Sequence, residues 1–263
     1  MAVIHNARHT FNNGVTNIPS TSVLNALDAM DPREWKIHFQ TFSSLTPVAA
    51  IELVAADVPV IDGYLWDAVQ ATAGDCEGSF TSQAESGGTL TLTNEGSADD
   101  SSLLQMEGGN FYAEVGFPWV FETRCVPTVT TTSSLFIGMG APTLTIDVVL
   151  DAGGAAFSPV TFIGCYATDS TGTTLHGVTS TATVNTDMGT GTIVTGTAFT
   201  FSCVYDGALA RAYLNGVLLG STSNFPTARL NPQLGMESGG AACAMEMDYI
   251  LWANKTPRGG ARP

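Results

Sequence analysis

The chain has 263 residues, of which 44% are hydrophobic and 13% charged, and its formal net charge is −15. It contains 28 glycines and 12 prolines, but only nine lysines and arginines together. Many turn-forming residues with few strong helix formers are typical of an all-β protein. The shortage of basic side chains argues against nucleic-acid binding, because phosphates are bound mainly by lysine and arginine.

The charge is concentrated in the middle of the chain. Residues 51–252 carry 21 acidic side chains and three arginines, which is a net charge of −18. Residues 1–50 are neutral overall, and residues 253–263 carry three basic side chains and no acidic one. An acidic body repels other acidic surfaces, so we expect contact with an acidic partner at the two ends of the chain.

Cysteine usage and hydropathy predict a protein made in a cytoplasm. The five cysteines are widely spaced without a C-x-x-C pair, which favours buried thiols over a disulfide framework. The first residues lack the apolar segment of a signal peptide, and no stretch approaches about 18 consecutive apolar residues. We therefore expect no membrane-spanning segment. The cysteines are Cys76, Cys125, Cys165, Cys203 and Cys243.

The chain begins with an arm and one predicted helix. Residues 1–19 show no sustained hydrophobic period, whereas residues 20–30 place apolar side chains at helical spacing. Ser20 or Ser22 can cap this helix at its start, and Pro32 ends it. A helix this short needs a surface to pack on.

Alternating apolar and polar side chains predict strands along the rest of the chain. Residues 43–61 contain two prolines and favour irregular or edge structure, and residues 168–198 favour edge strands or long loops. About a dozen strands at short spacing predict a two-sheet antiparallel sandwich. The expected strands are 35–42, 64–66, 89–93, 102–106, 119–125, 134–140, 144–150, 160–166 and 244–252.

Residues 199–221 predict a three-strand antiparallel meander. Phe199, Phe201, Cys203 and Tyr205 alternate with small or polar residues, which indicates a half-buried strand. The dipeptides Asp-Gly at 206–207 and Asn-Gly at 215–216 follow, and both tolerate the backbone conformations of tight turns. Such a meander is stable only inside a larger sheet.

The meander and the closing strand resemble the concanavalin A-like (laminin G-like) jelly roll. The matching text is FSCVYDGALARAYLNGVLLGS from residue 201, the Asn-Phe-Pro loop at 224–226 and MEMDYILWA at 245–253. More narrowly, three segments are similar to a family of tailed-bacteriophage virion proteins. They are HFQTFSSL at 38–45, residues 88–124, and the meander with its closing strand. The resemblance implies an all-β jelly-roll sandwich with a structural role on a capsid or tail and no cofactor.

Glycoside hydrolysis is the enzymatic alternative for this fold, because two carboxylates must flank the scissile bond. Jelly-roll glucanases carry them as a Glu-x-Asp-x-x-Glu strand. This chain offers Glu246 and Asp248 without a third acid, and a solvated outer face of the last strand explains both equally well. We therefore predict that the chain is not an enzyme and carries no catalytic residue.

Metal and nucleophile signatures are absent from the sequence. Asp99, Asp100, Asp147 and Asp151 are candidate oxygen ligands, but no D-x-D-x-D-G calcium loop exists. The four histidines are dispersed, and neither an H-E-x-x-H zinc motif nor a G-x-S-x-G elbow occurs. We expect no metal site and no cofactor. The histidines are His5, His9, His38 and His176.

We therefore expect a phage capsid decoration (cement) protein, made in the host bacterial cytoplasm and placed on the capsid surface of the virion. A jelly roll at residues 35–252 lies between an arm with a helix at 1–34 and a basic tail at 253–263. The arm would bind the major capsid protein, and the protein would form a trimer or dimer. The expected contact residues are His5, Asn6, Arg8, His9, Phe11, Asn12, Asn13, Lys255, Arg258 and Arg262.

The alternative is a tail-fibre or receptor-binding module that recognises host glycans. Aromatic rings near polar side chains stack on sugars, although alternating aromatics in strands more often belong to the core. A polysaccharide-degrading enzyme is a third possibility. The candidate glycan-binding residues are Tyr112, Trp119, Tyr166 and Phe225.

Overall fold

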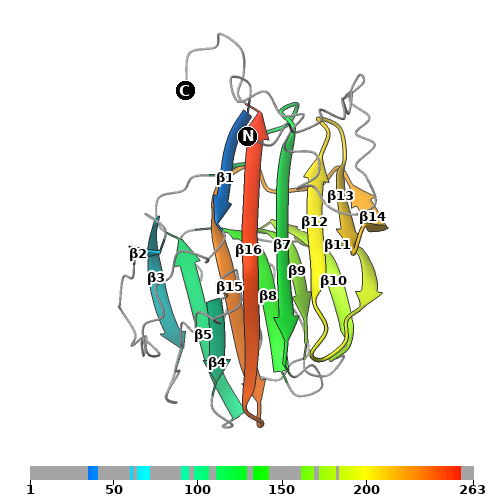
Figure 1. Cartoon of the computed structure of the whole chain (residues 1–263). Coiled ribbons are helices and arrows are strands. Elements are labelled where there is room, and N and C mark those ends of the chain that lie inside the picture. The colour runs from blue at the N-terminus through cyan, green and yellow to red at the C-terminus, as the bar shows by residue number, and fades with distance from the viewer. Residues whose placement is uncertain are drawn as a thin grey trace, which may run out of the picture.

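The computed structural model describes ten stretches of the chain. In these stretches the chain forms sixteen strands and no helix, and the strands build two antiparallel sheets that pack face to face (Figure 1). The predicted all-β architecture is therefore confirmed. The predicted arm and helix at 1–34 and the predicted strand at 144–150 lie outside the described residues, which are 35–40, 60–61, 64–71, 90–94, 98–106, 111–128, 133–141, 161–168, 172–181 and 184–255.

One sheet has seven strands and lies in front in Figure 1. Its order is β1-β16-β7-β12-β13-β14, and β4 also pairs with β16. The first and last described strands are therefore neighbours in the sheet. The strands are β1 (Trp35–Gln40), β4 (Leu90–Asn94), β7 (Trp119–Pro127), β12 (Phe199–Tyr205), β13 (Ala210–Leu214), β14 (Val217–Thr222) and β16 (Cys243–Lys255).

The other sheet has nine strands in the order β11-β10-β9-β8-β15-β5-β3-β2, with β6 paired to β15. It lies behind the first sheet in Figure 1. The strands are β2 (Val60–Ile61), β3 (Tyr64–Ala71), β5 (Ala98–Met106), β6 (Phe111–Tyr112), β8 (Ser133–Gly140), β9 (Phe162–Ala167), β10 (Thr174–Thr181), β11 (Val184–Thr192) and β15 (Arg229–Gly239).

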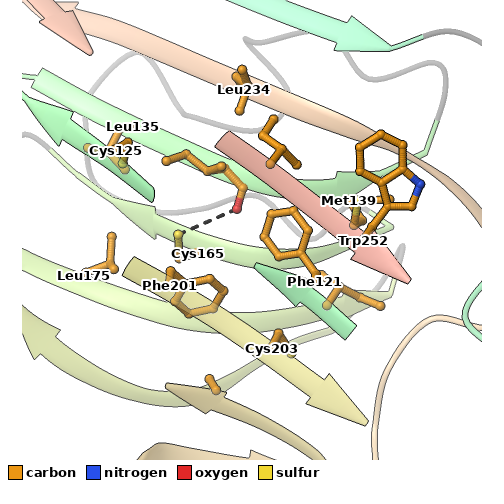
Figure 2. Packing of buried hydrophobic residues seen from close by; sticks show 14 of the residues in the cluster. Phe121, Cys125, Leu135, Met139, Cys165, Leu175, Phe201, Cys203, Leu234 and Trp252 are labelled. Atoms are coloured by element: carbon orange, nitrogen blue, oxygen red, sulfur yellow. Dashed lines mark hydrogen bonds between the residues drawn. The ribbon is translucent and has the colours of Figure 1, made fainter. Parts of the chain in front are cut away.

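The core fills the space between the sheets, and alternate residues of each strand point into it. Phe121, Phe201 and Trp252 come from the seven-stranded sheet and are fully buried with side chains of the other sheet (Figure 2). Four cysteines are free buried thiols, as predicted, and Cys76 lies outside the described residues. One of them, Cys165, donates a weak bond to the Ile137 carbonyl.

The predicted meander is confirmed as β12, β13 and β14. Asn215 and Gly216 have φ angles of 50° and 77°, so the two-residue turn has the twist that tight hairpins require. At the other turn, the Asp206 carboxylate accepts bonds from the Ala208 and Leu209 N–H groups at 2.8 and 2.9 Å. Both turns therefore form for the reasons that the sequence indicates.

The strand β15 was not predicted, although it pairs with both β8 and β5 in the middle of its sheet. Pro232 lacks the N–H group of a ladder bond, and Gly235 has no side chain to pack. Leu230, Leu234 and Met236 nevertheless alternate into the core. This alternation could have predicted the strand, but Pro232 and Gly235 argue against a central strand, so it was not predicted.

Candidate functional site

The outer face of the nine-stranded sheet carries the residues that form the candidate site. In each strand of this sheet, the inward side chains belong to the hydrophobic core. Cys165 on β9 and Leu234 on β15 are two examples. Successive side chains of a strand point to opposite faces. The residues between these core positions therefore face outward. From β11 to β15 they are Asp187, His176, Tyr166, Phe162, Phe136, Gly138, Asn231 and Gln233.

Three side chains from β9, β10 and β11 form one end of this face. The rings of Tyr166 and His176 stack with centroids 4.7 Å apart and planes within 9°. His176 Nδ1 lies 2.8 Å from Asp187 Oδ2, and the other carboxylate oxygen accepts the Gly189 N–H at 2.6 Å. The carboxylate is thus held at both oxygens. It orients the imidazole, because a carboxylate only accepts and the Nδ1 atom that faces it must donate.

This end of the face is open to solvent. The side chains of His176 and Asp187 are 20% and 48% exposed, and Tyr166 is partly exposed. Burial, followed by the negative charge of Asp187, raises the pKa of the Tyr166 phenol. The phenol therefore stays protonated and keeps its capacity to donate a hydrogen bond. Two stacked rings, a donor and a carboxylate acceptor are all within one partly exposed cluster.

Aromatic rings cover the middle of the face. Gly138 pairs with Gly164 across β8 and β9, and a Cβ on Gly138 would lie 2.5 Å from the Phe162 ring. Phe136 and Phe162 meet edge to face with centroids 5.9 Å apart, and both are fully buried. The two glycines therefore leave the space that these rings occupy.

Amide side chains form the other end of the face. Gln233 Nε2 donates to Gln105 Oε1 at 2.7 Å and to the Ala141 carbonyl at 2.8 Å. Asn231 lies two residues before Gln233 on the same face of β15, and both are at most 1% exposed. The face thus has a buried aromatic centre with hydrogen-bonding groups at both ends, and of these two ends only the one with His176 and Asp187 is exposed. From β11 to β5 it spans five strand spacings, which is about 24 Å.

The other aromatic candidates of the sequence lie elsewhere. Trp119 is fully buried, and Phe225 is 7% exposed. They contact each other edge to face with centroids 5.8 Å apart, and both pack on Tyr205. Their rings are therefore part of the core between the two sheets. Tyr112 on β6 is 40% exposed and is available to solvent.

The predicted partner-binding residues cannot be placed, except one. Lys255 is the last residue of β16, and its backbone N–H donates to the Pro118 carbonyl at 2.8 Å. The other nine residues lie outside the described residues. The arm therefore remains a prediction from sequence.

The carboxylates that the sequence analysis weighed for hydrolysis lie on the other sheet. Glu246 and Asp248 are partly exposed residues of β16, and Asp248 forms an ion pair with Arg124. A register shift falls between Met247 and Tyr249, so Asp248 sits in a bulge. Both carboxylates therefore lie outside the face that carries Tyr166.

No metal centre is found in the described part of the chain. It contains no group of three or more histidine, cysteine, aspartate or glutamate side chains with metal-site geometry. Asp99 and Asp100 belong to β5, while Asp147 and Asp151 lie outside the described residues. The same described residues include no helix that is long and apolar enough to cross a bilayer.

The fold is a concanavalin A-like jelly roll, as the sequence resemblance implied. The carbohydrate recognition domain of Emp47p has 10% sequence identity and a TM-score of 0.54, over 86% of this chain and 100% of that one. The endo-1,3-β-glucanase of Streptomyces sioyaensis has 13% identity and a TM-score of 0.55, over 87% and 99%. SCLam, an endo-β-1,3(4)-glucanase of family GH16, has 15% identity and a TM-score of 0.53, over 86% and 93%.

These likenesses concern the fold alone. No protein-family model matches the chain, and no curated protein is similar to it in sequence. The narrower resemblance to virion proteins therefore stays a prediction. What is established is a sandwich whose relatives in structure include a carbohydrate recognition domain and two glucanases.

The prediction that the chain is not an enzyme is wrong, because it rested on the missing third acid of one strand, the closing strand that carries Glu246 and Asp248. Two of the three similar structures are endoglucanases, so this fold supports hydrolysis. The argument from sequence required all carboxylates on one strand. Carboxylates supplied by different strands or loops would satisfy the same chemistry, and a pattern within one strand does not detect them.

Sequence reasoning identified Tyr166 but missed its partners. His176 was named only as a dispersed histidine, and Asp187 was not named at all. They meet through the pairing of β9, β10 and β11, a region that reads as threonine-rich loop or edge strand. No local motif signals this pairing, because the three residues are ten or more positions apart.

Proposed function

We propose that the protein binds carbohydrate on the outer face of its nine-stranded sheet. The observation that carries the proposal is the accessible cluster of Tyr166, His176 and Asp187. The C–H groups on one side of a pyranose pack on an aromatic ring, and sugar hydroxyls both donate and accept hydrogen bonds. A stacked ring beside a fixed carboxylate offers both kinds of contact.

The fold supports this proposal. One protein of similar structure is a carbohydrate recognition domain, and two others are named for the β-glucans that they cleave. The cluster of Tyr166, His176 and Asp187 offers the contacts that sugar binding needs, so binding is the function proposed for this face.

A finer proposal follows from the sequence resemblance to phage virion proteins. The protein would be a tail-fibre or receptor-binding module of a virion, and its ligand a host surface glycan. Capsid decoration through residues 1–34 is the second reading, with the major capsid protein as partner. Imaging of assembled particles with labelled protein separates them, because the first places the label on the tail and the second on the head.

The binding proposal is tested with a glycan array followed by calorimetry on the best ligand. Tyr166→Ala should weaken binding about tenfold, since an aromatic contact of this kind contributes roughly 1–1.5 kcal/mol. Tyr213→Ala is the matched control, because Tyr213 is a partly exposed tyrosine on the outer face of the other sheet.

The proposal fails if no glycan binds, or if Tyr166→Ala retains the affinity of the wild type. Equal losses in both variants would also contradict it, because they would indicate a general effect on folding. Tyr112→Ala belongs in the same series. A loss confined to that variant would move the site to β6.

A further inference from the structure

Two buried amide oxygens on β15 have no hydrogen-bond partner. Within the described part of the chain, Asn231 Oδ1 and Gln233 Oε1 accept no hydrogen bond, and each atom is closed to solvent. Leaving a buried acceptor unsatisfied costs about 1–3 kcal/mol, so native structures rarely keep one without a purpose. Two such atoms on one strand indicate a missing donor.

The orientation of the Gln233 amide is fixed by its neighbours. Its Nε2 donates to Gln105 Oε1 and to the Ala141 carbonyl. Rotating the amide by half a turn would place an oxygen against the Ala141 backbone carbonyl, so the unpaired atom of Gln233 is an acceptor and not a misassigned donor. The missing group must therefore carry hydrogen-bond donors.

The described neighbours of the two amides favour an uncharged donor. Asn231 and Gln233 are two positions apart on one face of a strand, which places their Cα atoms about 6.7 Å apart. The residues paired with them on β8 are Gly140 and Gly138, which add no side chain. The two groups that accept hydrogen bonds from Gln233 Nε2 are a neutral amide and a carbonyl, and an ammonium group or metal ion placed beside them would lose part of its hydration.

We infer that Asn231 and Gln233 form a binding position for a vicinal diol, and that this diol belongs to the glycan of the proposed function. Two adjacent hydroxyls, each donating over about 2.8 Å, match two acceptors on one strand face. The inference rests on the proposed function, and it assigns the hydroxyl recognition to β15 and the ring stacking to Tyr166. Because both oxygens are closed to solvent, association should be slower than about 10⁵ M⁻¹ s⁻¹.

The test uses Asn231→Leu with gluco-, manno- and galacto-configured trisaccharides as probes. The leucine removes the unpaired acceptor at similar volume, so the melting temperature should stay unchanged or rise, while affinity for the bound trisaccharide falls about tenfold. Asn94→Leu is the control. Asn94 is equally buried but donates to the Met236 carbonyl at 2.9 Å, so its loss should lower the melting temperature by several degrees and leave affinity intact.

Three results would overturn the inference. Asn231→Leu could lower the melting temperature as much as Asn94→Leu, which would mean that bound water satisfies the amide. It could leave trisaccharide affinity within twofold of the wild type. The wild type could bind none of the three probes. Loss of affinity in Tyr166→Ala without loss in Asn231→Leu would reject this inference alone and leave the proposed function standing.

Discussion

Replacing Gly138 by alanine should destabilise the sandwich strongly, because the added methyl group has no space. An ideal Cβ at this position lies 2.3 Å from the Ile163 carbonyl oxygen, 2.5 Å from the Phe162 ring and 2.8 Å from the Gly164 Cα. Two of these three atoms are backbone of the neighbouring strand β9. A side-chain rotation therefore cannot relieve the overlap, and β8 and β9 must move apart.

The expected cost follows from that separation. Overpacking of a filled site costs about 1–3 kcal/mol, and loosening one or two ladder bonds between β8 and β9 adds about 1 kcal/mol each. We expect a loss of about 3 kcal/mol in the free energy of unfolding. For a chain of this size that loss lowers the melting temperature by roughly 6–12 °C.

Urea denaturation followed by circular dichroism measures this loss, with Gly116→Ala as control. A Cβ on Gly116 meets no atom within 4 Å, and the substitution costs only the strain of its φ angle of 85°, about 1 kcal/mol. The reasoning is refuted if Gly138→Ala is no less stable than Gly116→Ala. It is also refuted if Phe162→Leu rescues Gly138→Ala fully, since the backbone contact would then be unimportant.

Three further predictions concern buried polar groups and thiols. Burial alone would raise the pKa of Asp206, but bonds from the Leu209 N–H, the Arg211 guanidinium and the Ala208 N–H hold it below its usual value. The stabilising contribution of Asp206 should therefore be present above about pH 4 and disappear as the pH falls through the lower folded pKa. Urea titrations should show that the free energies of unfolding of the wild type and Asp206→Asn converge at low pH. A difference that does not change with pH would contradict this. Tyr249→Phe should lower the free energy of unfolding by about 1.5–3 kcal/mol, because the Tyr249 hydroxyl donates to the fully buried Glu122 side chain at 2.8 Å. A loss below about 0.5 kcal/mol in calorimetry would contradict this prediction. Burial raises the pKa of the Cys165 thiol well above its usual range. Iodoacetamide should therefore modify Cys165 only after the protein unfolds. Peptide mass spectra that show labelled Cys165 in the native protein would contradict this and indicate that the core opens.

The sequence was most informative where hydrophobic alternation and turn residues agreed. The meander of β12, β13 and β14 has both signals, and its bounds follow from them. The strand β15 has alternation but contains Pro232 and Gly235, which normally exclude a central strand. It was missed for that reason, and with it the amides of Asn231 and Gln233.

The candidate site could be predicted only in part, because it depends on pairing between strands. Tyr166 was a candidate as an aromatic residue in a strand. Its contacts with His176 and Asp187 depend on the register of β9, β10 and β11, including a shift between His176 and Val178. Register is set by packing of the whole sheet, so a reading of local patterns cannot supply it.

The face on which a glycan binds is the most direct test of the account. A crystal structure of the protein with the best oligosaccharide from the array should show a sugar ring packed on Tyr166, with a hydroxyl within hydrogen-bond distance of the Asp187 carboxylate. A sugar bound on the outer face of the seven-stranded sheet, beside Glu246 and Asp248, would contradict the central claim.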